Sequence, residues 1–239
     1  YPKADLIIPN AIGTEQDLIN AFNIDKNKIQ VIHNLLDIKK IFELQKEPVE
    51  MDESIFTFVT VGRFFDQKNH LLLIKTMKDI NAKLIIIGDG VLRDELENTI
   101  VEYKLENKVF LLGQQANPYK YLSKADCFVL SSDYEGFPNV LLEALACKLP
   151  IISTDCQSGP REILAPGSDV NFQLKDDIEI GEYGILTAVG NSESLLKAMK
   201  RIFTDSVLRK TLIKKADTRA SAFDKNIIIE EWIGLLKIK

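Results

Sequence analysis

The sequence predicts an α/β protein with a parallel sheet that is covered by helices on both faces. Two observations support this prediction. Short apolar runs rich in Ile, Val and Leu alternate with segments of helical periodicity between residues 55 and 153, and these runs show no regular alternation of polar and apolar residues. Strands that alternate with helices form βαβ units, and a strand without a polar face is buried on both sides.

The predicted elements follow one another along the chain. The first forty residues read as a strand, a helix and a strand (6–8, 14–22 and 29–32), with Thr14 and Asp17 resembling the start signal of the helix. The later predicted strands are 55–61, 83–87, 109–112, 127–130, 150–153 and 184–189. The predicted helices between them are 70–77, 91–104, 119–124 and 140–147. Residues 165–183 are expected to be irregular, and the pattern is helical from Ser192 to the amphipathic segment 227–236.

Composition limits the classes of protein to consider. No apolar run approaches the ~20 residues that a membrane span needs, and no basic-then-apolar leader is present, so we expect a cytoplasmic protein. The net charge of −5 argues against a nucleic-acid partner. The three cysteines form no CxxC pair and are expected to be buried free thiols. With only two histidines, a histidine-based metal site is not expected.

Positive charge is concentrated near the C-terminal end of the sequence. From Lys197 to Lys239 there are 11 basic and 5 acidic residues, whereas the rest of the chain has 19 basic and 30 acidic residues. Such a segment can contact an anionic membrane, and it can equally be the solvated face of helices. Peripheral contact with the inner face of a membrane therefore stays open beside a purely cytoplasmic location.

The loops after the first two strands of the alternating region carry groups suited to an anion. Arg63 and Lys68 lie five residues apart on a loop that leads into a helix. Arg binds a diphosphate through a fork of hydrogen bonds, and Lys binds it as a point charge. The next loop, Gly88-Asp89-Gly90, lets the backbone approach a ligand closely. Two surface cations and a simple tight turn would explain the same residues, so both alternatives remain.

The segment after the fourth of these strands is the most informative. Glu135 and Gly136 precede Pro138, which suits the first turn of the helix predicted over 140–147. That helix is apolar on every face except at Glu143, and a lone buried carboxylate is costly unless a partner binds it. Glu143 is therefore either bonded to other protein groups or holds hydroxyl groups of a ligand.

This set of residues resembles the retaining glycosyltransferases of family 4, which have the GT-B fold of two facing Rossmann-like domains. Glu135 and Glu143 match the E-x7-E signature of that family. The other matching segments are Val61-Gly62-Arg63 with Lys68-Asn69 (phosphate-binding loop), Leu112-Gly113 (turn beside the nucleobase) and 158–163 (a loop of bacterial members that build surface polysaccharides). The resemblance covers nearly the whole chain, and Lys148 departs from it where many relatives have Gly.

The resemblance implies a role for each matching residue. Arg63 and Lys68 would bind the diphosphate of a nucleotide-sugar, Glu143 the ribose hydroxyls and Glu135 the transferred sugar, so the catalytic candidates are Arg63, Lys68 and Glu135. The donor-binding candidates are Gly62, Arg63, Lys68, Gly88, Gly113, Gln114, Glu135, Gly136, Phe137, Pro138, Asn139, Val140 and Glu143. No metal or other cofactor is expected, because the two cations would take the place of a metal ion.

The resemblance also implies a division of the chain. Residues 1–34 would be the end of an acceptor-binding domain with its linker, 35–222 the nucleotide-sugar-binding Rossmann-like domain, and 223–239 a helix that crosses back to the acceptor-binding domain. The sequence begins at Tyr1 and not at Met, so we expect a fragment that contains one half of a GT-B fold and transfers little sugar by itself.

The expected function is transfer of a sugar, with retention of its configuration, from a UDP-sugar or a related donor to a glycan or lipid-linked acceptor of a surface polysaccharide. An NAD-dependent oxidoreductase is one alternative, but it needs a G-x-G-x-x-G loop, and residues 88–93 lack the third glycine. A regulatory module that binds a sugar nucleotide is the other, and it would keep the phosphate-binding loop without an acceptor domain.

Overall fold

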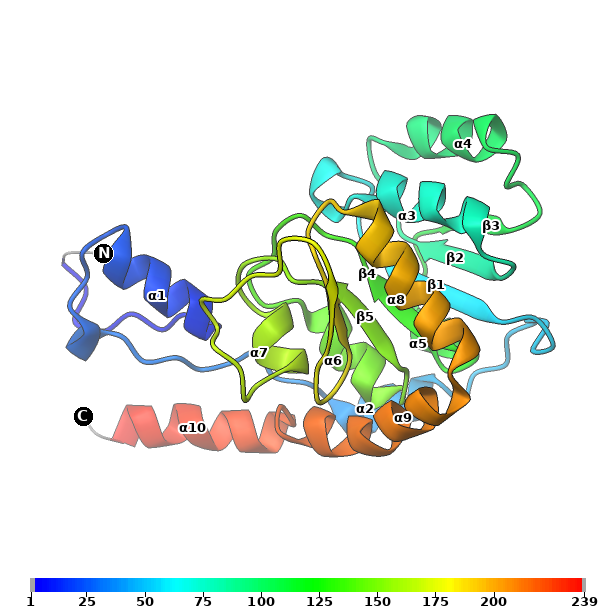
Figure 1. The fold of residues 1–239 in the computed structure, drawn as a ribbon. Helices are drawn as coiled ribbons and strands as arrows, with labels where there is room; N and C mark the ends of the chain where they lie inside the picture. Colours follow the sequence, from blue (N-terminus) through cyan, green and yellow to red (C-terminus); the bar gives the residue numbers. More distant parts are fainter. Residues whose placement is uncertain (1–2, 238–239) are drawn as a thin grey trace.

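The fold is built on a seven-stranded sheet with the strand order β3-β2-β1-β4-β5-β7-β6. The computed structural model describes residues 3–237. All neighbouring strands are parallel except β6 and β7, which are antiparallel. The strands are β1 (Thr57–Val61), β2 (Lys83–Ile87), β3 (Val109–Gly113), β4 (Cys127–Leu130), β5 (Ile151–Thr154), β6 (Ile178–Ile180) and β7 (Ile185–Thr187). This arrangement confirms the predicted fold class (Figure 1).

Helices cover both faces of the sheet because the buried strands present apolar side chains to each face in turn. Phe58 and Val129 belong to a core with α3, α4 and α8, whereas Val59 and Phe128 belong to a core with α2, α5 and α6. The helices are α1 (Ile12–Asn20), α2 (Ile38–Leu44), α3 (His70–Thr76), α4 (Arg93–Glu102), α5 (Tyr119–Leu122), α6 (Asn139–Ala146), α7 (Pro160–Leu164), α8 (Ser192–Thr204), α9 (Ser206–Ser221) and α10 (Lys225–Lys237). Within residues 3–237, none of these helices combines the length and the apolar character of a membrane-crossing segment.

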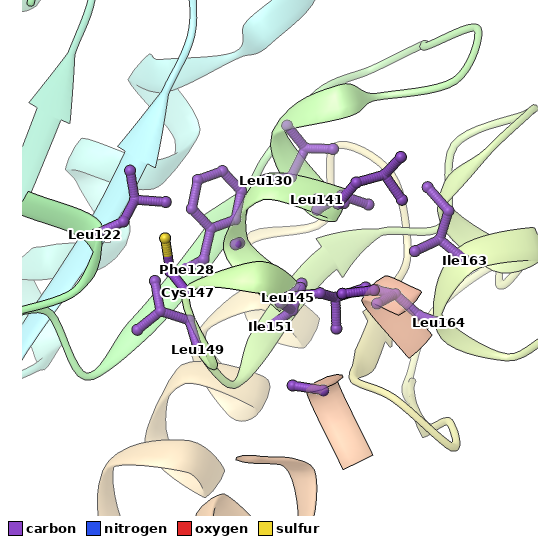
Figure 2. Close-up of a cluster of buried hydrophobic side chains, with 14 of the residues drawn as sticks. Leu122, Phe128, Leu130, Leu141, Leu145, Cys147, Leu149, Ile151, Ile163 and Leu164 are labelled. Atoms are coloured by element: carbon purple, nitrogen blue, oxygen red, sulfur yellow. The ribbon is translucent and has the colours of Figure 1, made fainter. Parts of the chain in front are cut away.

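The core around α6 explains why that helix has so few polar residues. Leu141 and Leu145 of α6 belong to the same buried cluster as Phe128 and Leu130 of β4 and Ile163 and Leu164 of α7 (Figure 2). The helix also packs against α2 and α9. Since α6 has neighbours on several sides, its apolar residues are buried and its one carboxylate stands out.

The three cysteines lie in this interior. Cys127, Cys147 and Cys156 are all buried and free, which confirms the expectation from the sequence. Burial raises the pKa of the Cys147 and Cys156 thiols to about 12, with a smaller contribution from a nearby glutamate in each case. These thiols are therefore in the unreactive, protonated form near neutral pH.

The N-terminal residues and α10 extend from the sheet on the same side (Figure 1). The chain enters the sheet region through residues 33–36 and leaves it after α9, and these two crossings lie together. Leu36 N–H donates to the Phe223 carbonyl at 2.8 Å, and Lys225 N–H donates to the Leu36 carbonyl at 2.9 Å. Lys225 also pairs with Asp37 at 2.7 Å. Trp232 on α10 is 38% exposed.

Some predicted elements of the first forty residues are wrong. The two predicted strands are reduced to a single parallel bridge between Ile7 and Ile29, because within the described residues they have only each other as partners. The predicted start signal at Thr14 and Asp17 does not cap a helix. Helix α1 begins earlier, at Ile12, and its N-cap residue Ala11 makes no side-chain cap.

Three short elements escaped the sequence analysis. These are α2, α7 and β6, of seven, five and three residues, and they are too short to show a clear period. Strand β6 lies inside the region predicted to be irregular. It is held by an ion cluster, in which the buried Arg161 forms bonds of 3.0 and 2.7 Å to Asp155 and of 2.9 Å to Glu179 of β6.

The carboxylate of Glu162 supplies the missing cap of α1. Its two oxygens accept hydrogen bonds from the N–H groups of Ile12 and Gly13, each at 2.8 Å, and His33 lies 3.6 Å away. Burial opposes ionisation of Glu162, but the hydrogen bonds from His33 and from these two N–H groups outweigh it, so its pKa lies below the ordinary value of 4.5. The charged form of Glu162 thus fastens the N-terminal segment to α7.

Replacement of this carboxylate should loosen α1. We expect Glu162→Ala to cost about 1–3 kcal/mol, because two N–H groups lose their acceptor. Amide hydrogen exchange of Ile12 and Gly13 should accelerate, whereas Glu162→Gln, which keeps one acceptor oxygen, should have an intermediate effect.

The same contact should depend on pH. Since the folded-state pKa of Glu162 is lowered, its contribution is complete above the ordinary pKa of 4.5 and is lost as the pH falls through the folded value. The protection factors of the Ile12 and Gly13 amides, which correct for the slower intrinsic exchange in acid, should therefore fall in acid in the wild type and not in Glu162→Ala. Equal pH dependence in both proteins would contradict the assignment.

Candidate functional site

The site lies where the order of the strands reverses. β1 pairs with β2 on one side and with β4 on the other, so the connections from β1 and from β4 leave the sheet in opposite directions. In open parallel sheets the crevice at such a reversal, outside the carboxyl ends of the strands, is the usual ligand site. The loops 62–69 and 131–138 follow β1 and β4 and meet at this crevice.

The two loops are joined by hydrogen bonds that the sequence did not predict. Asp133 N–H donates to the Gln67 carbonyl at 2.9 Å, and the Asp133 carboxylate accepts from the Asn69 side chain at 2.8 Å. The Gln67 amide donates to the Tyr134 carbonyl at 2.8 Å, and the Ser131 hydroxyl donates to the Lys68 carbonyl at 2.8 Å. These bonds fix the backbone on both sides of Lys68.

The predicted cation Lys68 and the predicted carboxylate Glu135 form an ion pair at the centre of this junction. The distance from Lys68 Nζ to Glu135 Oε1 is 2.5 Å, and the Ser132 hydroxyl donates to the same oxygen at 2.7 Å. The two side chains are only 17% and 8% exposed. A charge pair this well covered has lost much of its hydration, so each member is poised to bind another charged or polar group.

Asn69 gives the loop its shape. Its backbone is left-handed, with φ of 46°, a conformation that Asn tolerates better than most residues. Its side-chain oxygen caps α3 by accepting from the Leu72 N–H at 3.3 Å. Lys68 therefore sits directly before a helix start.

A recess beside the ion pair gathers several other predicted residues. Its lining consists of Val61, Gly62, Arg63, Ile87, Gly88, Asp89, Gln114, Gln115 and Pro118. Arg63 is exposed and its guanidinium lies 5.1 Å from the centre of the Phe65 ring. The recess thus has apolar walls, two glycine edges and an exposed cation, Arg63, that forms no ion pair with the residues that the structure describes.

Gly88 cannot carry a side chain in this conformation. Its φ is 146°, and a Cβ atom would lie 1.9 Å from the Gly62 carbonyl oxygen. Gly113 has φ of 70°, and its carbonyl accepts from the Gly88 N–H at 3.0 Å. The two glycines let the ends of β1, β2 and β3 approach closely, and Gly88 lines the recess, whereas the predicted residue Gly113 lies outside its lining.

Glu143 lies behind this recess on α6 and has a protein partner. The hydroxyl of Tyr119, the residue after Pro118, donates to Glu143 Oε1 at 3.2 Å. Burial raises the pKa of Glu143, and the bond from Tyr119 only partly offsets this effect. One oxygen of the carboxylate thus has a partner among the described residues, and both alternatives from the sequence analysis keep support.

The predicted residues 136–140 divide into two groups. Gly136 and Val140 are not fully buried, and no atom would lie within 4 Å of a Cβ at Gly136. Phe137, in contrast, is 6% exposed, and its ring centre lies 4.9 Å from that of His33. Pro138 is the N-cap residue of α6, and Asn139 accepts from the Asn34 side chain at 2.7 Å. This loop therefore joins the site to the linker at residues 33–34.

His70 is a further buried residue at the site that the sequence analysis did not single out. It is 4% exposed, its ring lies edge-on to Phe64, and its Nδ1 atom has no hydrogen-bond partner among the described residues. Burial, followed by the charge of Lys68, lowers its pKa to about 4. His70 is thus neutral near pH 7, so it adds no second positive charge beside Lys68. In residues 3–237, no cluster of three or more His, Cys, Asp or Glu side chains could hold a metal ion.

Known proteins resemble this chain in sequence and in structure. The sequence profile of the family described as "Glycosyl transferases group 1" matches residues 41–219. The N-acetylgalactosamine-N,N'-diacetylbacillosaminyl-diphospho-undecaprenol 4-alpha-N-acetylgalactosaminyltransferase of Campylobacter jejuni is 41% identical over 238 residues, which are 99% of this chain and 61% of that protein. An uncharacterised glycosyltransferase of Methanocaldococcus jannaschii is 37% identical over 263 residues, which cover 99% of this chain and 64% of that protein.

A solved structure shows the same fold. HepE of Anabaena, crystallised with UDP, superposes with a TM-score of 0.83 at 24% identity, over 99% of this chain and 64% of that one. The chain thus spans about three fifths of the length of the relatives it matches.

The buried carboxylate of Glu143 should lower the stability of the ligand-free protein. Since its folded-state pKa is raised, the unfolded state binds fewer protons than the folded state above the ordinary pKa of 4.5, and stability falls as the pH rises through that window. We therefore expect Glu143→Gln, which keeps an acceptor for Tyr119, to be more stable than the wild type in urea unfolding at pH 7.5. The difference should shrink at pH 4, and a loss of stability at pH 7.5 would contradict this account.

Proposed function

This chain belongs to the family of group 1 glycosyl transferases, and we propose that it is the donor-binding part of a retaining, family 4 enzyme that transfers a sugar from a UDP-sugar to a lipid-linked glycan. The main support is the junction at the strand reversal, where Lys68 and Glu135 are held together beside Arg63 and the glycine-edged recess. Because the chain spans 61% of its Campylobacter relative, the activity is proposed for the whole protein.

The recess suits the nucleotide. Val61, Ile87 and Pro118 offer apolar walls for a planar base, and Gln114 and Gln115 offer amide groups at its edge. Arg63 at the mouth and Lys68 beside it would bind the diphosphate, and Glu143 would bind the ribose hydroxyls through the oxygen that Tyr119 leaves unbonded. We choose UDP because the structurally similar HepE binds it.

The sugar would lie towards Glu135. Once the diphosphate binds Lys68, the Glu135 carboxylate loses its cation and becomes an acceptor for sugar hydroxyls. The exposed backbone of Gly136 lies next to it. The ion pair of the ligand-free protein thus provides both partners for the donor, each held in place by the bonds between the two loops.

The chemical step would depend on charge stabilisation. When the bond between the sugar and the diphosphate breaks, negative charge builds up on the leaving diphosphate. Fixed cations stabilise that charge without reorganisation, and we propose that Arg63 and Lys68 do so in place of a metal ion. The acceptor hydroxyl would attack from the side of the leaving group, which keeps the configuration of the sugar.

The relatives support a proposal for the acceptor class. The name of the Campylobacter enzyme describes a diphospho-undecaprenol substrate, and an acceptor of that kind resides in a membrane. We therefore propose a cytoplasmic protein in polysaccharide biosynthesis that contacts the membrane surface peripherally, with the basic region after Lys197 facing the anionic lipids.

Loss of Lys68 should weaken nucleotide binding. We expect Lys68→Ala to lower the affinity for UDP, measured by calorimetry, by roughly tenfold to a hundredfold, because a bond between a cation and phosphate is lost. Lys83→Ala is a matched control, since Lys83 is also partly buried and paired with a carboxylate. Lys83 is the first residue of β2, whereas the recess lies at the other end of that strand. Binding of NAD in preference to UDP, or equal UDP binding by Lys68→Ala, would contradict the proposal.

Replacement of Glu135 should weaken binding of the sugar without weakening binding of the nucleotide. In Glu135→Gln, Lys68 no longer forms an ion pair with residue 135, so UDP does not have to break that pair when it binds. We therefore expect UDP to bind at least as tightly as in the wild type. Any gain in affinity that a UDP-sugar shows over UDP should disappear, because the acceptor for the sugar hydroxyls is lost. Calorimetry with UDP and UDP-N-acetylgalactosamine measures both effects. A fall in UDP affinity as large as in Lys68→Ala would show that Glu135 does not act on the sugar.

A further inference from the structure

A second recess lies between α1 and the loops that follow β5. We call it the α1 recess. It is formed by three separate segments: the exposed side of α1, residues 155–162 and residues 170–173. Its lining includes the polar side chains of Gln16, Asp17, Asn20, Gln157, Asn171 and Gln173, besides those of Asp155, Ser158, Arg161 and Glu162. None of these residues was assigned a role in donor binding.

One aromatic ring stands out at the α1 recess. Phe172 is 53% exposed, although it is a large apolar side chain on a loop. Its ring is nevertheless held in place, because the guanidinium carbon of Arg161 lies 4.9 Å from the ring centre. Arg161 itself is 5% exposed and is fixed by Asp155 and Glu179. The ring thus has a rigid cation against it and remains largely open to solvent.

The amide groups of the α1 recess are available for a ligand. The side chains of Gln16 and Asn20 form no hydrogen bond with any residue that the structure describes. Gln157 donates to Asp17 at 3.0 Å, and Gln173 donates to the Asp155 carbonyl at 3.0 Å, while its amide oxygen accepts no hydrogen bond from residues 3–237. An ordered aromatic ring flanked by amides and a carboxylate can pack against the C–H face of a sugar and bond its hydroxyls.

Charge argues against an anionic ligand at this position. Arg161 is the one basic residue among those that line the α1 recess, and the two carboxylates of Asp155 and Glu179 already neutralise it. The Asp17 carboxylate is exposed at the rim. A phosphate or diphosphate would meet this negative charge without a free cation, whereas a neutral, hydroxyl-rich ligand would not be repelled.

The α1 recess adjoins the end of the site proposed for the transferred sugar. Gly159, which lines it, packs so closely on the loop before α6 that a Cβ atom would lie 2.5 Å from Pro138 Cδ and 2.9 Å from the Gly136 carbonyl. Its φ of 87° is likewise suited to glycine. Cys156, another lining residue, is close enough to Glu135 for that carboxylate to contribute, after burial, to its raised pKa.

We propose that the α1 recess is a subsite for a neutral sugar residue of the acceptor glycan, with the ring of Phe172 as its stacking surface. This inference rests on the proposed function, because it needs a donor sugar at Glu135 for the neighbouring subsite to serve. The ligand class is an uncharged hexose or N-acetylhexosamine residue, bound by Gln16, Asn20 and Gln173 through its hydroxyl or acetamido groups.

The test uses the whole chain, labelled with ¹⁵N and titrated with methyl N-acetyl-α-galactosaminide while amide signals are recorded by NMR. We expect saturable shifts at Gln16, Asn20 and Phe172, with or without saturating UDP. Phe172→Ala should weaken this binding about tenfold, since the stacking surface is lost. Phe42→Ala is the matched control, because Phe42 is 52% exposed on α2 outside the α1 recess and should bind the glycoside like the wild type.

Three results would overturn the proposal. The first is the absence of shifts at the α1 recess, the second is equal binding by Phe172→Ala and the wild type, and the third is displacement of the glycoside by UDP. Shifts at the α1 recess caused by sodium phosphate and not by the glycoside would contradict the ligand class. A failure of the same sample to bind UDP would instead contradict the proposed function, whatever the glycoside does.

Discussion

The pairing of β1 with β4 is the contact on which the arrangement of the site depends. It places two strands that are far apart in the sequence side by side, with Phe58 opposite Cys127, and it makes their following loops neighbours. Every bond between residues 67–69 and residues 131–135 follows from this adjacency. The apolar residues that bury β1 and β4 from both sides therefore also determine the distance between Lys68 and Glu135.

The site contains features that a protein selected only for stability would not keep. The buried charges of Lys68 and Glu135 have given up hydration for one another, and apolar replacements of such pairs are often no less stable. The Glu143 carboxylate lies in an apolar helix with one donor, and His70 has a ring nitrogen without a partner among the described residues. These features lie together at the carboxyl ends of the strands. Such a cluster is typical of a binding site, where polar groups kept for a ligand lower the stability of the ligand-free protein.

The sequence predicted the sheet well because buried parallel strands have a local signature. The bounds of β2 and β4 were predicted without error, since β4 is an apolar run between polar residues and β2 is a run of Leu and Ile that starts at Lys83 and ends before Gly88. The α1 cap was predicted wrongly because the true partner, Glu162, lies about 150 residues away and has no local signal. β6 was missed because an ion cluster, and not an apolar pattern, holds it.

For the site, the sequence indicated which residues lie at strand ends but not how they contact one another. The rule that ligands bind at the carboxyl ends of strands brought Arg63, Lys68 and Glu135 to one edge. The ion pair itself, the Tyr119 partner of Glu143 and the contact of Phe137 with His33 depend on side-chain directions that spacing does not fix.

The two places where the chain crosses between the sheet region and the N-terminal segment lie side by side, at Leu36 and at Phe223–Lys225. A single covalent connection would permit rotation about any axis, whereas two adjacent connections that are bonded to each other suppress twisting and leave mainly one bending axis. The paired crossings therefore restrain the N-terminal segment against the sheet region from one end, and the Glu162 carboxylate holds α1 from the other. Since Asn34 bonds to Asn139, and His33 packs against Phe137, the first crossing is also tied directly to the loop that precedes α6.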